Sequence, residues 1–242
     1  MRTLFLADAH LNQPSDANYR SLLTFLEQQL GRTDTLVLLG DIFEFWVGYS
    51  YSVFSAYVPV LEMFDRFRAA GTQIIFVEGN HDFHLGPYFE QHLAARVLPD
   101  GGGVKLDERK VFLAHGDLAN PKDRSYRLLR AVLRSWPLYM LVQILPPDLT
   151  WRIAAMACRQ SRRGCEEKSR QQPAREILLE YARGIHARGF EAIVTGHFHQ
   201  PFHAREAGFE LIALGDWISQ FSYAVCEDGV FELRSYEPSA TA

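Results

Sequence analysis

The residues of this sequence that are best suited to chemistry are Asp, Asn and His side chains that directly follow short apolar runs. Five such clusters occur along the chain: Asp8-Ala-His10, Gly40-Asp41, Gly79-Asn-His-Asp82, His115-Gly-Asp117 and Gly196-His-Phe-His199. Gly, Asn and Asp favour turns, so each cluster alone has an ordinary structural explanation. Their repetition after five apolar runs instead predicts that the polar side chains gather at one site.

The composition of the clusters predicts metal binding. Seven side chains could serve as ligands: Asp8, His10, Asp41, Asn80, His115, His197 and His199. Seven donors are too many for one tetrahedral ion and suit two ions that share a bridging carboxylate. Mixed carboxylate, amide and imidazole donors favour Mn, Fe, Zn or Ni over Ca or Mg. We expect two divalent ions, with Mn²⁺ as the first expectation, clamping a phosphoryl group and generating hydroxide for in-line attack.

The spacing within the clusters allows simpler interpretations as well. Asp8 and His10 are two residues apart, so in an extended strand end both would point to one side; the same holds for His197 and His199. Asp41 after a glycine would equally suit a helix N-cap. The two remaining acids, Asp82 and Asp117, could orient histidine ligands or could serve in turns.

The apolar runs that precede the clusters are typical of buried strands. They span residues 3–7, 35–39, 73–77, 111–114 and 192–195, and helical spacing covers 19–30 and 53–70. This alternation predicts an α/β sandwich, in which ligands collect beyond the carboxyl ends of strands. Four further short strands, at 201–206, 210–214, 223–226 and 230–236, predict an antiparallel meander near the C-terminus. The glycine run 101–103 is interpreted as a hairpin or turn.

A segment from about residue 121 to 188 has a helical pattern without a convincing strand. We interpret the chain as one domain, 1–242, with a helical insertion there. Residues 122–170 contain eleven Lys or Arg and four Asp or Glu, a local charge of +7; since the whole chain carries −4, the remainder carries −11. The basic residues favour either an anion-binding cap or a solvated cationic face. The apolar stretch 136–147 favours either lipid contact or ordinary packing.

Composition excludes several classes of protein. The chain has 242 residues, 48% of them hydrophobic, which is enough for a substantial core and argues against disorder. Nothing in the charge balance suggests a nucleic-acid partner. Three cysteines without a CxxC pair argue against a disulfide framework or a cysteine zinc site. The N-terminal apolar run is too short for a signal peptide, and no stretch is long enough to span a membrane, so we expect a cytoplasmic location.

Taken together, the five clusters resemble the sequence blocks of calcineurin-like metallophosphoesterases. The resemblance implies a central pair of β-sheets flanked by helices. It implies one metal held by Asp8, His10, Asp41 and His199, and a second held by Asp41, Asn80, His115 and His197, with Asp41 bridging. It also implies that His81 lies beside the leaving group and acts as the catalytic residue.

Within this superfamily, the chain more closely resembles the UDP-2,3-diacylglucosamine pyrophosphohydrolase family. It is carried by the length, the block spacing, the segment Leu39-Gly-Asp-Ile-Phe-Glu-Phe-Trp46 and the helical insertion. It implies cleavage of a UDP-lipid to UMP and lipid X in lipid A biosynthesis, at the cytoplasmic face of the inner membrane. The residues implied to bind substrate are Asn80, His81, Asp123, Tyr126, Arg159, Arg162, Arg163 and His197. In that family the insertion caps the site and holds the acyl chains.

One position departs from this closer family. The best-known members carry arginine where this sequence has His81, whereas histidine is the residue of the wider superfamily. Two alternatives therefore stay open beside the UDP-lipid substrate. The first is a metallophosphoesterase for another nucleotide, phosphodiester or phosphomonoester. The second is a binding scaffold that keeps the fold without turnover.

Overall fold

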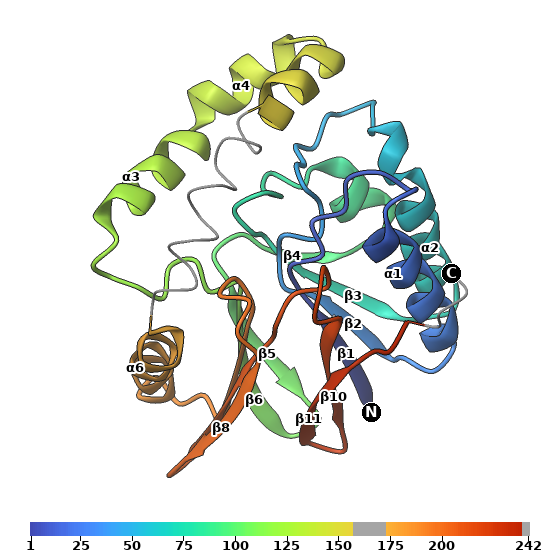
Figure 1. Ribbon diagram of the computed structural model, residues 1–242. Helices are drawn as coiled ribbons and strands as arrows, with labels where there is room; N and C mark the ends of the chain where they lie inside the picture. The colour runs from blue at the N-terminus through green and yellow to red at the C-terminus, as the bar shows by residue number, and fades with distance from the viewer. Residues whose placement is uncertain (157–172, 239–242) are drawn as a thin grey trace.

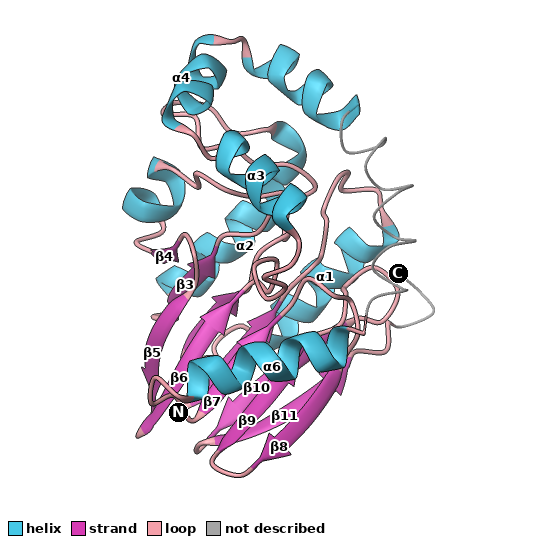
Figure 2. Cartoon of the chain, turned by 90° about the vertical axis from the view of Figure 1, so that its left-hand side faces the viewer, coloured by secondary structure: helices cyan, strands magenta, loops and turns pink. Residues whose placement is uncertain are grey.

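Two β-sheets pack face to face between layers of helices in the computed structural model, which describes residues 1–156 and 173–238 (Figure 1). The helices α1 (Ala17–Gln29) and α2 (Val58–Ala69) lie on one side of the sheets, and α6 (Ala174–His186) lies on the other. Figure 2 shows α6 lying across the strands of the nearer sheet. The expected four-layer α/β/β/α architecture is confirmed.

The two sheets place the carboxyl ends of their parallel strands at one edge. The first sheet has the order β11-β10-β1-β2-β3-β4 and the second β5-β6-β7-β9-β8. The first contains β1 (Arg2–Leu6), β2 (Thr35–Leu38), β3 (Gln73–Val77), β4 (Arg96–Leu98), β10 (Ser222–Glu227) and β11 (Val230–Ser235). The second contains β5 (Gly102–Leu106), β6 (Arg109–Ala114), β7 (Ala192–Thr195), β8 (Phe202–Glu206) and β9 (Phe209–Ala213). Because β1, β2 and β3 are parallel, as are β6 and β7, the loops that follow them can meet.

Each sheet is buried on both faces because successive side chains of a strand point to opposite sides. In β1, Leu4 packs toward α1 and α2, whereas Phe5 packs between the sheets. In β6, Val111 packs between the sheets and Phe112 packs toward α6. This double burial explains why the strands appear in the sequence as continuous apolar runs.

The C-terminal strands differ from the expected single meander. β8 and β9 form an antiparallel pair in the second sheet, and β10 and β11 form another in the first. The chain crosses between the sheets after β9, which pairs in parallel with β7, while β10 pairs with β1. The four C-terminal strands are therefore divided between the two sheets, with β8 at the edge of one and β11 at the edge of the other.

The glycine run takes part in a turn, although not in the turn of the hairpin: Gly101, with φ of 79°, donates its backbone N–H to the carbonyl oxygen of Leu98. Gly101 forms an isolated bridge with Pro99, and Gly102 and Gly103 begin β5. A Cβ on Gly103 would lie 2.6 Å from the ring of Phe190, so the absence of a side chain permits close packing there. The hairpin between β5 and β6 instead turns after Leu106.

A group of helices stands beyond the carboxyl ends of the strands (Figure 1). It consists of α3 (Arg124–Leu133), α4 (Trp136–Ile144) and the helical residues 147–156, and these are called the cap helices below. By contrast, α6 lies inside the segment 121–188 but packs on the second sheet through Leu178 and Ala182. Two short helices, η1 (Ser55–Tyr57, 3₁₀) and η2 (Tyr88–His92, π), complete the described elements. Among the described residues, no helix has both the length and the apolar character needed to cross a membrane.

Candidate metal centre

The loops after five strands carry the seven expected ligands, and most of these residues adopt a backbone conformation that L-residues rarely use. Asp8 and His10 follow β1 with φ of 53° and 44°, and His197 and His199 follow β7 with φ of 71° and 52°. The expectation that each pair lies in an extended strand end is therefore wrong. The chain leaves the sheet and coils tightly, and such strain is characteristic of functional sites. Nor does Asp41 (φ 53°) cap a helix, because the described residues 41–54 form none.

Glycines make room for the ligands. A Cβ on Gly79 would lie 2.2 Å from Oδ1 of Asp41, and a Cβ on Gly196 would lie 2.5 Å from Oδ2 of Asp8. Gly40, with φ of 85°, would place a Cβ 2.7 Å from Nδ1 of His115. No larger residue fits at these positions unless a ligand moves.

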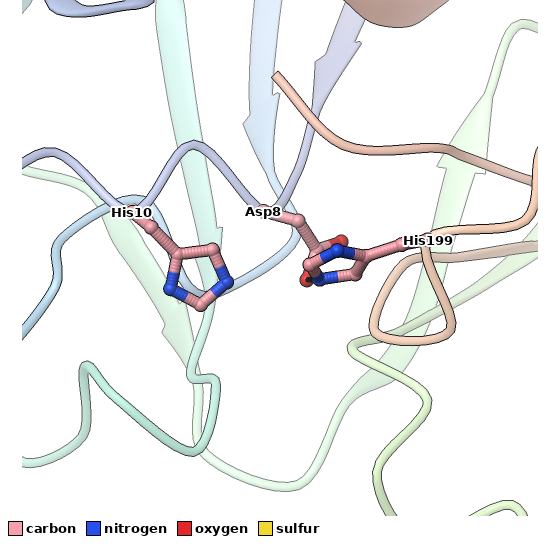
Figure 3. A group of neighbouring side chains, drawn as sticks. All are labelled: Asp8, His10 and His199. Atoms are coloured by element: carbon pink, nitrogen blue, oxygen red, sulfur yellow. Dashed lines mark ion pairs between the residues drawn. The ribbon is translucent and has the colours of Figure 1, made fainter. Parts of the chain in front are cut away.

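A first group of donors consists of Asp8, His10 and His199, whose ligand atoms lie within 4.8 Å of one another. Figure 3 shows the carboxylate of Asp8 beside the ring of His199, with the ring of His10 on the same side of the loop. Nε2 of His199 lies 3.3 Å from Oδ1 of Asp8. That oxygen is buried without a hydrogen bond, while Oδ2 accepts the backbone N–H of His197 over 2.8 Å. A buried carboxylate oxygen without a hydrogen bond suits a cation.

A second group consists of Asp41, His115 and His197, also within 4.8 Å. Nδ1 of His197 lies 3.2 Å from Nε2 of His115, and Oδ1 of Asn80 lies 3.1 Å from the same Nε2. Nδ1 of His115 donates to the carbonyl oxygen of Leu39 over 2.7 Å, because a carbonyl can only accept. In the neutral ring Nε2 is then unprotonated and available as a ligand.

Asp41 joins the two groups. Its Oδ2 lies 3.8 Å from Nε2 of His10 in the first group and 3.5 Å from Nε2 of His115 in the second. The structure thus brings all seven expected ligands together, divided into the two sets that the family resemblance implied. The donor types and the central carboxylate fit a pair of divalent ions.

The electrostatics of the centre favour positive charge. Burial opposes ionisation of Asp41, but the rings of His115 and His81 hold its pKa well below the ordinary value. Burial also opposes the charge on His115, yet the Asp41 carboxylate raises the pKa of that ring to about 10. Without a metal, the Asp41 carboxylate is therefore ionised and the His115 ring retains a proton, which a cation that binds there displaces.

Two other histidines of the centre, His10 and His197, are held neutral. Burial, assisted by the nearby His81, lowers the pKa of His10 to about 3. Burial, assisted by His115, lowers the pKa of His197 to about 4. Neutral imidazole is the form that binds metal, so both rings are ready as ligands near neutral pH.

The expected catalytic residue, His81, lies beside the first group. Its ring meets the ring of His10 edge-on, with 4.8 Å between the centroids. Nδ1 donates to the backbone oxygen of Glu44 over 2.8 Å, which fixes the orientation of the ring. The backbone N–H of His81 donates to Oδ1 of Asp41.

The remaining expected substrate residues differ in their placement. Asp123 caps α3, where its Oδ1 accepts the backbone N–H of Tyr126. The hydroxyl of Tyr126 donates to Oδ2 of Asp117 over 2.6 Å. Tyr126 and Asn80 both line a small cavity of about 20 Å³ between α3 and the ligand loops. Arg159, Arg162 and Arg163 lie outside the described residues.

Sequence reasoning missed the contacts that tie α3 to the centre. Arg134 donates to Oε2 of Glu78 over 2.7 Å and to the carbonyl oxygen of Gly79 over 2.8 Å. Arg130 donates to Oδ2 of Asp117, two residues after the ligand His115. These arginines neutralise buried acids of the core. The arginines in and after α3 were visible in the sequence, but the acids that they contact were not.

Asp82 also has a clearer role than the sequence allowed. Oδ1 of Asp82 accepts the backbone N–H groups of Asp41 and Gly79, and its Oδ2 accepts that of Ile42. Asp82 therefore ties the loops after β2 and β3 together, the turn role that had been left open. Glu44 and Asp216, which were not expected to contribute, are buried beside ligand histidines.

Curated proteins that share one name are similar to this chain along most of its length. The curated protein UDP-2,3-diacylglucosamine hydrolase of Aeromonas salmonicida (strain A449) is 32% identical, over 95% of this chain and 91% of the relative. The protein of the same name from Stenotrophomonas maltophilia (strain K279a) is 32% identical, over 96% and 98%. That from Neisseria meningitidis serogroup B is 30% identical, over 93% of each chain.

Solved structures support the fold. A structure described as a novel archaeal phosphodiesterase superposes with a TM-score of 0.52 at 13% identity, over 97% of this chain and 99% of the other. A hypothetical protein from Pyrococcus horikoshii OT3 gives 0.51 at 15% identity, over 99% and 89%. Residues 1–201 match the family described as calcineurin-like phosphoesterase. With relatives at 30% identity or more along nearly the whole chain, this match shows that the protein belongs to the calcineurin-like phosphoesterase family and is a hydrolase.

Proposed function

We propose that this protein hydrolyses the diphosphate bond of UDP-2,3-diacylglucosamine and releases UMP and lipid X. The observation that carries the proposal is the identity of 30–32% to proteins named UDP-2,3-diacylglucosamine hydrolase, along at least 91% of each relative. Attack would occur at the phosphorus on the UMP side. The proposed activity belongs to lipid A biosynthesis.

We further propose two divalent ions, Mn²⁺ as the first choice and Fe, Zn or Ni as alternatives. Asp8, His10, Asp41 and His199 would hold the first, and Asp41, Asn80, His115 and His197 the second. The two groups of donors, with Oδ2 of Asp41 between them, support this division. When bound, such a pair neutralises phosphoryl charge and makes water a stronger nucleophile near neutral pH.

The protein's own residues would orient the substrate around this centre. The ring of His81 is oriented through Nδ1 and lies edge-on to His10, and His81 would support the developing charge or the leaving group. Asn80, His197, Asp123 and Tyr126 would contact the head group. Asn80 and Tyr126 line one small cavity, so the two side chains lie on the same side of the ligand loops. Arg159, Arg162 and Arg163 would bind phosphate, as their guanidinium groups are suited to do.

The cap helices would contact the acyl chains and the membrane surface. Their apolar side chains are unusually exposed: Leu128 is 69% exposed, Trp136 71% and Ile144 77%. Exposed apolar patches of this kind mark lipid or protein contacts. Burying each CH₂ of an acyl chain contributes about 0.8 kcal/mol, so a few such contacts provide much of the substrate affinity. A cytoplasmic protein resting on the inner face of the inner membrane would meet a lipid substrate this way.

A second candidate is a phosphodiester or phosphomonoester substrate other than the UDP-lipid. The observation in its favour is His81, which stands where the best-known UDP-lipid hydrolases carry arginine. The exposed apolar face of the cap helices argues against it, since a small polar substrate offers nothing for that face to bind.

Product analysis distinguishes these candidates. The protein is incubated with UDP-2,3-diacylglucosamine and Mn²⁺, and the products are identified by mass spectrometry. We expect UMP and lipid X, with no turnover after treatment with a chelator. Intact UDP-lipid together with hydrolysis of a small chromogenic phosphodiester would favour the second candidate instead.

A further inference from the structure

Each histidine of the first donor group has a second carboxylate behind it, that is, facing the ring nitrogen that points away from the ligand carboxylate. His10 directs Nε2 toward Asp41, at 3.8 Å from Oδ2, while its Nδ1 lies 3.7 Å from Oε2 of Glu44. The Glu44 side chain is only 8% exposed. At 3.7 Å the carboxylate is within ion-pair distance of the ring, though beyond the length of a hydrogen bond.

His199 repeats the arrangement from a different part of the chain. Its Nε2 lies 3.3 Å from Oδ1 of Asp8, and its Nδ1 lies 3.7 Å from Oδ2 of Asp216. The Asp216 side chain is 7% exposed. Two histidines that follow different strands thus each face a ligand carboxylate with one nitrogen and a buried carboxylate with the other.

The carboxylate of Asp216 is held rigidly by its own loop. Its Oδ1 accepts the backbone N–H groups of Ile218 over 2.9 Å and of Ser219 over 2.6 Å. The side-chain amide of Gln220 donates to the backbone oxygen of His199 over 3.0 Å, which ties the loop to the histidine. Oδ2 of Asp216 is thereby directed to the ring.

The second donor group is built differently. Nδ1 of His115 donates to a neutral carbonyl, the backbone oxygen of Leu39. For His197, Nδ1 itself is the nitrogen that faces His115. In metal sites, a carboxylate behind a histidine fixes the ring orientation and makes the nitrogen on the other side a stronger donor. Among the described residues, Glu44 and Asp216 reach ion-pair distance behind the first group, whereas Asp117 acts on His115 and His197 without such a pair.

We propose that Glu44 and Asp216 are positioning residues that act through His10 and His199 to strengthen the first metal site selectively. The inference rests on the proposed metal centre, because it assumes that both histidines are ligands. Neutralising either carboxylate should therefore weaken one of two ions and leave the other bound as before.

The test uses two near-isosteric variants of the full chain, Glu44→Gln and Asp216→Asn. Asp216→Asn keeps an oxygen for the backbone N–H groups and replaces only the charge that faces His199. Glu27→Gln is the matched control, since Glu27 is an exposed carboxylate on α1 paired with Arg66. Each metal-free protein is titrated with Mn²⁺ by calorimetry and with Co²⁺ by visible absorption.

We expect two Mn²⁺ sites in the wild type and in the control. In each variant one site should weaken by about 10–100-fold, the range for lost carboxylate partners of ligand histidines, with a changed Co²⁺ spectrum. The other site should keep its affinity. Equal affinities in variant and wild type, or equal weakening of both sites, would overturn the proposal.

A double variant separates positioning from general support of the fold. If Glu44 acts through His10, Glu44→Gln should cause no further loss of affinity in a His10→Ala background. An independent loss there would mean that Glu44 binds an ion itself, together with the nearby His81, and would overturn the positioning role. A wild type that binds fewer than two ions would instead refute the proposed metal centre, and the inference with it.

Discussion

Oδ1 of Asp41 accepts a 2.9 Å hydrogen bond from the backbone N–H of His81, so that Oδ2 is the oxygen that faces the two donor groups. One carboxylate therefore has two separate tasks. Oδ1 holds the loop that carries Asn80 and His81, and Oδ2 lies between His10 and His115. This division allows the metal-binding task to be removed without the structural one.

Asp41→Asn should remove both metals or leave one weakly bound. The amide oxygen still accepts from His81, whereas an uncharged NH₂ group replaces Oδ2 between the two ions. Metal content of the purified protein, measured by elemental analysis, tests this. Asp65→Asn, on the exposed face of α2, should retain the wild-type content. Two full equivalents in an active Asp41→Asn protein would rule out a bridging role.

His81→Ala should keep both metals and lose about 10²–10⁴ in turnover, the range for a positioned acid or base. His92→Ala, an exposed histidine beside Asp65, is the control and should be fully active. His81→Arg tests the departure from the closer family: improved turnover of the UDP-lipid would place this chain in that pathway. Loss of metal from His81→Ala would show that the ring is a ligand, contrary to the assignment made here.

Much of the fold could be predicted because its strands are buried on both faces. Runs such as 35–38 and 73–77 are apolar at every position or nearly so, and the polar clusters follow them directly. β4 escaped notice because it has only three residues. The division of the last four strands between two sheets also escaped notice, because pairing depends on distant partners such as β1 and β7 rather than on local sequence.

The ligands of the candidate site were visible in the sequence, but the residues around them were not. His10 and His199 stand in short motifs after predicted strands. Glu44 and Asp216 lie 34 and 17 residues from the histidines they face, and no motif connects them. Arg134 likewise meets Glu78 across 56 residues. Contacts of this kind depend on how loops from separate strands converge, which periodicity cannot reveal.

Gly196→Ala should destabilise the protein by about 1–3 kcal/mol, the usual cost of overpacking a tight site. The new Cβ would lie 2.5 Å from Oδ2 of Asp8 and 2.7 Å from Cβ of Ala7, so the ligand must move. Gly184→Ala in α6 meets no atom within 4 Å and should stabilise by up to about 1 kcal/mol. Urea unfolding of both variants provides the comparison. Equal effects would mean that the loop after β7 can relax, and that the close fit around Asp8 is unimportant.

Arg134→Ala should destabilise the protein by about 3–5 kcal/mol near neutral pH, because it leaves the buried carboxylate of Glu78 unpaired. Burial already raises the pKa of Glu78, and Arg134 opposes that rise. Without the arginine the pKa rises further, so the folded state favours the protonated acid. The destabilisation should therefore be full at neutral pH and shrink as the pH falls through the raised pKa.

A double-variant cycle checks the assignment to Glu78. Urea unfolding at pH 7 should show that Glu78→Gln recovers part of the stability lost in Arg134→Ala, because it removes the unpaired charge. Additive losses would show that Arg134 acts mainly through its hydrogen bonds to the carbonyl oxygens of Gly79 and Pro99.

Arg159→Ala and Arg163→Ala should raise KM for UDP-2,3-diacylglucosamine and barely change the hydrolysis of a small chromogenic diester. A hydrogen bond from a charged group contributes about 1.5–3 kcal/mol, which corresponds to a rise in KM of about 10–150-fold. The metal content should stay at the wild-type value, because neither residue belongs to the proposed ligand set. Arg183→Ala is the control, because Arg183 of α6 forms an exposed ion pair with Glu206 of β8. Steady-state kinetics with the two substrates side by side separates the possibilities. Equal losses on both substrates would mean that these arginines support the fold or the metal centre, because a residue that binds only the UDP-lipid cannot slow a substrate that never reaches it.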